Sequence, residues 1–178
     1  MNRVLILLFL LISAAVEAQK YNSVRGSISF LSDAVIEDIA AENTKALAIL
    51  DANSRQLAFS VPVSEFQFEK TLMQEHFNEK YMETEKYPKA TFQGALSEFS
   101  LTNNTSQQVT AKGKLTIHGV TKDVLIPGTL LADKNGSIKL QAAFVVVLND
   151  YNVKIPKLLW ENIAEEVNVK IDFTLQPK

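Results

Sequence analysis

The sequence contains no cysteine and only two histidines among its 178 residues. The absence of cysteine excludes disulfides, thiol nucleophiles, zinc–thiolate sites and iron–sulfur clusters, as well as the lipidated cysteine of a bacterial lipoprotein. Two histidines are too few for a histidine-rich metal site. We therefore expect no cofactor and no metal, which leaves a binding protein, a structural protein or a carboxylate-based enzyme.

The chain also has no excess of charge of either sign. Eighteen basic and twenty acidic residues give a formal net charge of −2. Without a basic excess to neutralise a phosphate backbone, a nucleic-acid partner is not expected. The 47% of hydrophobic residues exclude a disordered chain and are typical of one globular domain.

Residues 1–18 are predicted to be a secretory signal peptide. Arg3 supplies the positive start, and the apolar run from Val4 to Ile12 is too short to span a bilayer. Small residues at Val16 and Ala18 precede an expected cut after Ala18. An uncleaved anchor is the alternative. Residues 19–178 should then form one domain that is periplasmic or secreted.

The rest of the sequence predicts eight or nine strands, because short runs alternate apolar and polar residues between turn signals. Pro62 places its strand at an edge or a bulge, and Asn135-Gly136 predicts a type I′ hairpin turn. One run is nearly all apolar, which is typical of a strand covered on both faces. The predicted strands are Val24–Leu31, Val35–Ala41, Ala46–Leu50, Gln56–Val63, Ala90–Leu101, Val109–Ile117, Val120–Leu131, the apolar Ile138–Leu148, and Glu166–Leu175.

Two helices are expected among the strands, at Glu69–Met82 and Pro156–Asn162. The first would either cap an end of the sheet structure or pack on its outside. Its apolar underside would consist of Phe66, Phe68, Leu72, Phe77 and Tyr81. Sequential antiparallel strands predict an all-β sandwich or an up-and-down barrel, and the pattern does not separate these two.

A barrel of about eight strands can be filled by side chains or can hold one slim ligand. Small residues on the inward faces, at Gly94, Ala111 and Gly113, either make room for a ligand or accept a neighbouring ring. The pattern alone favours the filled barrel. The large inward candidates are Phe30, Phe59, Phe92, Leu115, Ile117, Phe144, Val146 and Phe173.

Signals for catalysis are weak in this chain. It has no Gly-x-Ser-x-Gly nucleophile elbow. His76 adjoins Glu75, but neighbouring helix positions do not share a face. His118 belongs to a tight turn with Gly119, where its side chain is expected to satisfy backbone groups. We therefore expect a protein that is not an enzyme.

Two stretches resemble the YceI-like family. The first, residues 75–92, ends in Tyr87-Pro88-Lys89-Ala90-Thr91-Phe92, and the second runs from Gly113 through His118-Gly119-Val120-Thr121 to Lys122. The resemblance implies an eight-stranded, lipocalin-like antiparallel barrel in a secreted or periplasmic bacterial protein. It also implies a long apolar ligand, such as a polyisoprenoid or a fatty amide, inside a hollow barrel. The closing segment Asp150–Pro156 resembles a shorter branch expected in Bacteroidetes-like bacteria.

The sequence departs from the family pattern in two places. Val24–Phe30 keeps only the end of the family's opening strand, and Glu69–Met73 replaces its Arg-Asp-x-His-Leu segment. Recognition of a ligand headgroup by those family residues therefore does not transfer to this chain.

The expected function is non-enzymatic carriage of a long apolar lipid. The alternative is a filled barrel that acts through a protein partner, for example in a membrane redox or stress system. A transient membrane contact and a homodimer are left open. The predicted cavity lining is Phe30, Phe59, Phe92, Leu115, Ile117, Phe144 and Phe173, and the predicted mouth is Phe66, Phe77 and Tyr81.

Overall fold

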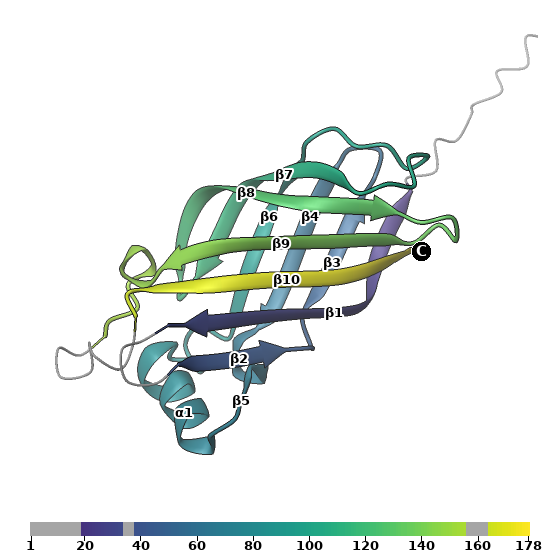
Figure 1. Ribbon diagram of the computed structural model, residues 1–178. Coiled ribbons are helices and arrows are strands. Elements are labelled where there is room, and N and C mark those ends of the chain that lie inside the picture. Colours follow the sequence, from purple (N-terminus) through teal and green to yellow (C-terminus); the bar gives the residue numbers. More distant parts are fainter. Residues whose placement is uncertain (1–18, 34–37, 156–163) are drawn as a thin grey trace, which may run out of the picture.

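The computed structural model in Figure 1 describes residues 19–33, 38–155 and 164–178. The predicted signal peptide and the predicted helix Pro156–Asn162 lie outside the described residues. Part of the predicted strand Val35–Ala41 also lies outside them; its end appears as a strand that begins at Ile39.

Eight antiparallel strands close into a barrel, as the family resemblance implies; the strand pattern alone left a sandwich open. Their order around the ring is β1, β3, β4, β6, β7, β8, β9 and β10, and β10 pairs with β1 to complete it. Because β10 pairs with β1, the ring lacks the two outer edge strands that an open sheet would have. The bounds are β1 Lys20–Ser32, β3 Leu47–Asp51, β4 Gln56–Pro62, β6 Lys89–Leu96, β7 Gln107–Ile117, β8 Val120–Ala132, β9 Ile138–Val147 and β10 Glu166–Pro177.

Two short strands extend the wall beyond the ring. The start of β1 pairs with β3, but its last five residues pair with β2 (Ile39–Asn43), which in turn pairs with β5 (Gln67–Phe68). The fully buried Asn43 holds the break between β2 and β3. Its side-chain nitrogen donates to the carbonyl oxygen of Pro62 at 2.7 Å, and its side-chain oxygen accepts from the Lys45 N–H at 2.8 Å.

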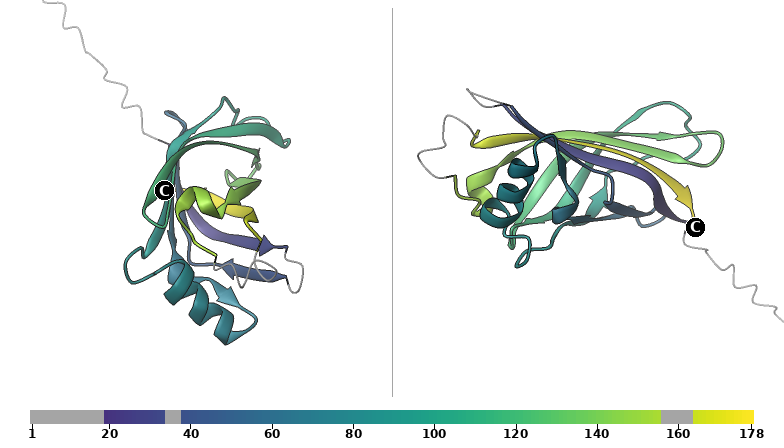
Figure 2. Two further views of the ribbon diagram at one scale, coloured as in Figure 1. Left: turned by 90° about the vertical axis from the view of Figure 1, so that its left-hand side faces the viewer. Right: turned by 90° about the horizontal axis from the view of Figure 1, so that it is seen from below.

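The predicted helix Glu69–Met82 is present as two consecutive pieces, α1 (Thr71–His76) and η2 (Phe77–Tyr81). They lie beside β2 and β5 at one end of the barrel, which we call the α1 end (Figures 1 and 2). The expectation that Leu72 faces the barrel is wrong, because its side chain is 61% exposed. Short helical turns η1 (Val63–Glu65) and η3 (Leu148–Tyr151) complete the described helices.

The two predicted hairpin turns have different outcomes: the tight turn at His118-Gly119 is present, whereas the turn at Asn135-Gly136 is of another type. His118 and Gly119 both have positive φ, +50° and +75°, as a two-residue type I′ turn requires. At Asn135-Gly136 only the glycine has positive φ, so the predicted type I′ turn is wrong there. Instead, the Asp133 carboxylate accepts hydrogen bonds from the N–H groups of Asn135 and Ser137.

The predicted strand Ala90–Leu101 is too long, since β6 ends at Leu96. Side chains take over the backbone hydrogen bonds beyond that point. Ser97 Oγ accepts from the Thr110 N–H, and Gln107 bonds both the N–H and the carbonyl oxygen of Ser100. Such local bonding competes with a strand ladder.

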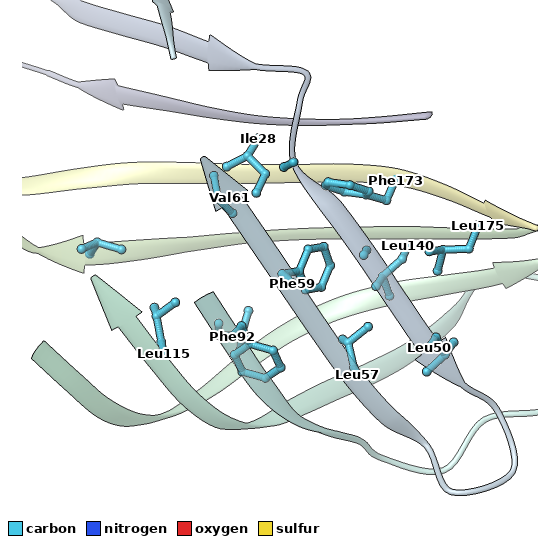
Figure 3. Close-up of a cluster of buried hydrophobic side chains, with 14 of the residues drawn as sticks. Ile28, Leu50, Leu57, Phe59, Val61, Phe92, Leu115, Leu140, Phe173 and Leu175 are labelled. Carbon is cyan, nitrogen blue, oxygen red and sulfur yellow. The ribbon is translucent and has the colours of Figure 1, made fainter. Parts of the chain in front are cut away.

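The end of the barrel opposite α1 is filled with apolar side chains, and we call it the closed end. Five large side chains from four strands meet there without measurable exposure: Leu50, Leu130, Ile138, Phe173 and Leu175. Figure 3 shows Leu50, Phe173 and Leu175 among them. Because these residues come from β3, β8, β9 and β10, the closed end ties both sides of the ring together.

Candidate functional site: the barrel cavity

A cavity of about 480 Å³ occupies the barrel and extends to the α1 end. This volume lies within the range of small-molecule sites, roughly 300–1,000 Å³. The barrel is therefore neither wholly filled nor wholly hollow. No Asp, Glu, Lys or Arg is among the described residues that line the cavity.

Aromatic rings form the boundary between the cavity and the closed end. Phe59 of β4 lies 5.1 Å from Phe173 of β10 and 6.5 Å from Phe92 of β6, measured between ring centroids. Because β4 and β10 are not neighbours in the ring, the contact of Phe59 with Phe173 crosses the barrel interior (Figure 3). Phe59 and Phe92 line the cavity floor, and Phe173 lies behind it.

A second aromatic group lies at the α1 end. Four rings form it: Phe30 of β1, Phe66, Phe68 of β5 and Phe77 of η2. Phe30 and Phe77 each contact the other three rings, with centroid separations of 5.0–5.9 Å. All four line the cavity. The same apolar rings therefore hold the helical segment against the barrel and line the cavity.

Nine of the ten residues predicted for the site line this cavity: Phe30, Phe59, Phe66, Phe77, Tyr81, Phe92, Leu115, Ile117 and Phe144. Their contacts with a ligand remain predictions. The prediction that Phe173 lines the cavity is wrong. It is fully buried in the closed end, with its ring packed against Gly26 and Phe59.

Sequence reasoning left other lining residues out of the predicted site. Phe68 lies in the two-residue strand β5, which is too short to show an alternating pattern. Tyr151 and Val153 enter from η3 and the residues after it, where no periodic signal exists. The helical spacing of Met73 with Phe77 was a usable signal, since both line the cavity.

The glycines of β6 and β7 serve strand packing and do not line the cavity. Gly94 and Gly113 are directly paired, and a β-carbon on either would collide with the backbone of the other strand. The space inside the barrel is bordered instead by alanines, at Ala90, Ala111 and Ala142.

The polar residues of the lining offer little chemistry. Burial raises the pKa of Tyr81, and burial together with Asp150 raises the pKa of Tyr151. Both phenols therefore stay protonated and uncharged at neutral pH. His76 is the only imidazole among the lining residues described. Over the described ranges, no group of three or more His, Cys, Asp or Glu side chains could hold a metal ion.

His118 joins three segments at the α1 end. Its Nε2 lies 2.8 Å from Glu83 Oε2, and its Nδ1 lies 3.2 Å from the carbonyl oxygen of Tyr151. The ring also packs edge-on against Tyr87 at 4.5 Å. The β7–β8 turn is thereby fixed to η3 and to the segment that follows η2, in keeping with a structural histidine.

The fold and the cavity define an eight-stranded antiparallel barrel with an apolar interior. The chain belongs to the YceI-like family, whose domain matches residues 12–175. No curated protein matches the chain. Among the described residues, no helix has the length and apolar character needed to cross a membrane.

Three solved structures share this fold. A polyisoprenoid-binding domain from Saccharophagus degradans, implicated in plant cell wall breakdown, aligns with a TM-score of 0.78 and 13% identity, covering 90% of this chain and 99% of that domain. Burkholderia cenocepacia BcnA aligns at 0.68 and 19% identity, covering 84% and 95%. A Campylobacter jejuni YceI protein aligns at 0.57 and 19% identity, covering 75% and 81%.

Proposed function

We propose that this protein binds a long apolar lipid in its barrel and carries it without chemical change, in the periplasm or after secretion. The observation that carries the proposal is the cavity of about 480 Å³ whose described lining has no Asp, Glu, Lys or Arg. Family membership and the polyisoprenoid-binding neighbour support a lipid of this kind. The predicted signal peptide supports the location.

Apolar burial would supply the affinity. Each buried methylene contributes about 0.8 kcal/mol, so a chain with ten methylenes inside the cavity would gain roughly 8 kcal/mol before ordering costs. Among the described residues of the lining there is no Lys or Arg to pair with an anionic head. A chain with an uncharged inner end therefore fits this cavity better than a buried carboxylate or phosphate would.

The test is to purify the protein from its native compartment, extract it with organic solvent and identify the extract by mass spectrometry. One dominant long-chain species in stoichiometric amount is expected. A clean extract from folded protein would contradict the proposal and favour the filled-barrel alternative, in which a protein partner is the ligand.

A pair of variants sharpens this test. Ala111→Phe places a large side chain on a cavity-lining position of β7 and should remove most of the lipid. Ala95→Phe places the same ring on β6 outside the lining, so its lipid content should equal that of the parent protein. Equal lipid content in the two folded variants would count against this cavity as the binding site.

A further inference from the structure

The barrel wall is incomplete between β8 and β9. These strands run for 13 and 10 residues, but they pair only over Gly128–Ala132 and Ile138–Ala142. Along the remaining stretch, residues 120–127 of β8 and 143–147 of β9 do not pair with each other. We call this stretch the seam. Figure 1 shows β8 bending away while β9 runs straight toward η3.

Pro127 explains why the ladder stops where it does. Ile117 and Val120 close a two-residue hairpin and form a hydrogen-bonded pair, so odd-numbered residues of β8 direct their N–H groups away from β7. Position 127 would be the next donor to β9 beyond the paired stretch. Proline has no N–H to donate there, which is why it is found at strand edges and bulges.

At the end of the β8–β9 ladder, next to the seam, the cavity and a depression on the outer surface share lining residues. The depression on the outside of the wall is lined by Pro127, Ala143 and Lys170, among others, and it shares Gly128, Gln141, Ala142 and Ile171 with the cavity lining. Gly128 and Ala142 form the last pair of the β8–β9 ladder. The last pair of the ladder therefore places only small residues, a glycine and an alanine, between the cavity and the outer depression.

The outer surface beside the seam is apolar, unlike that of the flanking strands. Leu125 on β8 is 67% exposed and Val145 on β9 is 51% exposed, with Pro127 and Ala143 next to them along the strands. The prediction that Ile138–Leu148 is covered on both faces is therefore wrong. The neighbouring outward positions carry Thr110, Lys112 and Lys114 on β7, and Asn168, Lys170 and Asp172 on β10.

Two lysines flank the apolar surface. Lys112 pairs with Leu125 across β7–β8, and Lys170 pairs with Ala143 across β9–β10. Neither forms an ion pair with the residues that the structure describes, whereas Lys114 and Lys139 are paired with Asp123 and Asp172. Exposed apolar side chains between free ammonium groups complement a bilayer that carries anionic headgroups.

We propose that the β8–β9 seam is a lateral portal, which docks on an anionic lipid bilayer through Leu125, Val145, Lys112 and Lys170 and passes the lipid chain between the bilayer and the cavity. This inference rests on the proposed function. It adds the route of the ligand and the surface that supplies it. Two contacts connect η3 to the β7–β8 turn and the start of β8, at the α1 end of the seam. They are the ion pair Lys122–Asp150 and the hydrogen bond between His118 and the Tyr151 carbonyl.

The first test seals the seam. The chain has no native cysteine, so Leu125→Cys/Val145→Cys can be bridged with a flexible bismaleimide without side reactions at other thiols. The matched control is Leu47→Cys/Ser60→Cys, which bridges a pair in the intact β3–β4 ladder across the barrel. The probe is a pyrene-labelled long-chain alcohol in phosphatidylcholine vesicles containing phosphatidylglycerol.

Bridging the seam should slow uptake of the probe by about tenfold or more, since closure of an entry route acts on the rate of binding. Bridging the control pair should leave the rate unchanged. Equal rates in the two bridged proteins would overturn the portal. If the unbridged parent takes up no probe, even from detergent micelles, then the proposed function fails as well.

The second test addresses docking. Leu125→Asp/Val145→Asp removes the apolar contact at exposed positions, where such changes seldom affect folding. Leu47→Asp/Ile49→Asp is the matched control, since these side chains are 62% and 51% exposed on β3. We expect transfer from vesicles to slow about tenfold only in the seam variant, with uptake from micelles preserved in both. Equal transfer by both variants, or equal rates on vesicles without phosphatidylglycerol, would overturn docking at this surface.

Discussion

The closed end and the α1 end are built from the same strands, yet one is solid and the other is hollow. At the closed end, long side chains such as Leu50, Leu130 and Leu175 meet across the barrel with no measurable exposure. Toward the α1 end, alanines at 90, 111 and 142 line the wall and the strands β8 and β9 part. The comparison teaches that the two ends of one barrel have different roles: the closed end supplies stability, and the α1 end supplies space for a ligand.

The largest effect should come from the closed end. Phe173→Ala removes a fully buried ring that contacts Gly26 and Phe59, and should destabilise the protein by about 3–5 kcal/mol. Urea unfolding followed by circular dichroism would measure the change. Because Phe173 lies behind the cavity floor, the folded variant should still contain lipid. Loss of lipid without loss of stability would break the comparison.

Phe77→Ala makes the corresponding change at the α1 end. Its ring is partly exposed and belongs to the four-ring group with Phe30, Phe66 and Phe68. Removing it should cost only about 1–2 kcal/mol, since less apolar surface returns to water. Lipid retained through purification should fall more than in Phe173→Ala. The same two measurements serve both variants, and equal destabilisation by both would erase the distinction between the ends.

His118→Asn tests whether the contacts of this side chain hold the segments of the α1 end together. Asparagine tolerates the positive φ of this position but cannot reach both Glu83 and the Tyr151 carbonyl. The loss of these bonds should cost about 1 kcal/mol. Hydrogen exchange should accelerate in η3 and in the residues after η2, while β3 and β10 at the closed end keep their protection. Uniform acceleration throughout the barrel would show that His118 supports the whole fold.

Sequence reasoning predicted the strands well because alternation is a local property of each strand. It could not tell which end is hollow, because that depends on side chains that meet from distant strands, as Phe59 meets Phe173. The apolar run at Ile138–Leu148 predicted burial of both faces. The missing β8–β9 pairing instead leaves Val145 exposed, and only the partner strand could have revealed this. Phe68, expected beneath the helix, was left out of the predicted lining because its two-residue strand is too short to show alternation.

The smallest effect concerns the turns of the closed end. Aspartates stabilise these turns, whereas a histidine stabilises the β7–β8 turn at the α1 end. A hydrogen bond from the Ser137 hydroxyl, aided by the N–H groups of Asn135 and Ser137, lowers the pKa of the Asp133 carboxyl. A carboxyl with a lowered pKa in the folded state stabilises the protein above its unfolded pKa. This contribution disappears as the pH falls through its folded value.

Asp133→Asn should therefore destabilise the protein slightly at neutral pH, and the difference from the parent should shrink as the pH falls below the usual aspartate range. Urea unfolding of both proteins over a pH series would measure this convergence. Asp51 caps the β3–β4 turn in the same way, through Ser54 and Asn53, and its pKa is lowered too. Since Asp51 still titrates in both proteins, its contribution cancels in the difference. A difference that stays constant with pH would show that the turn is held by its backbone alone.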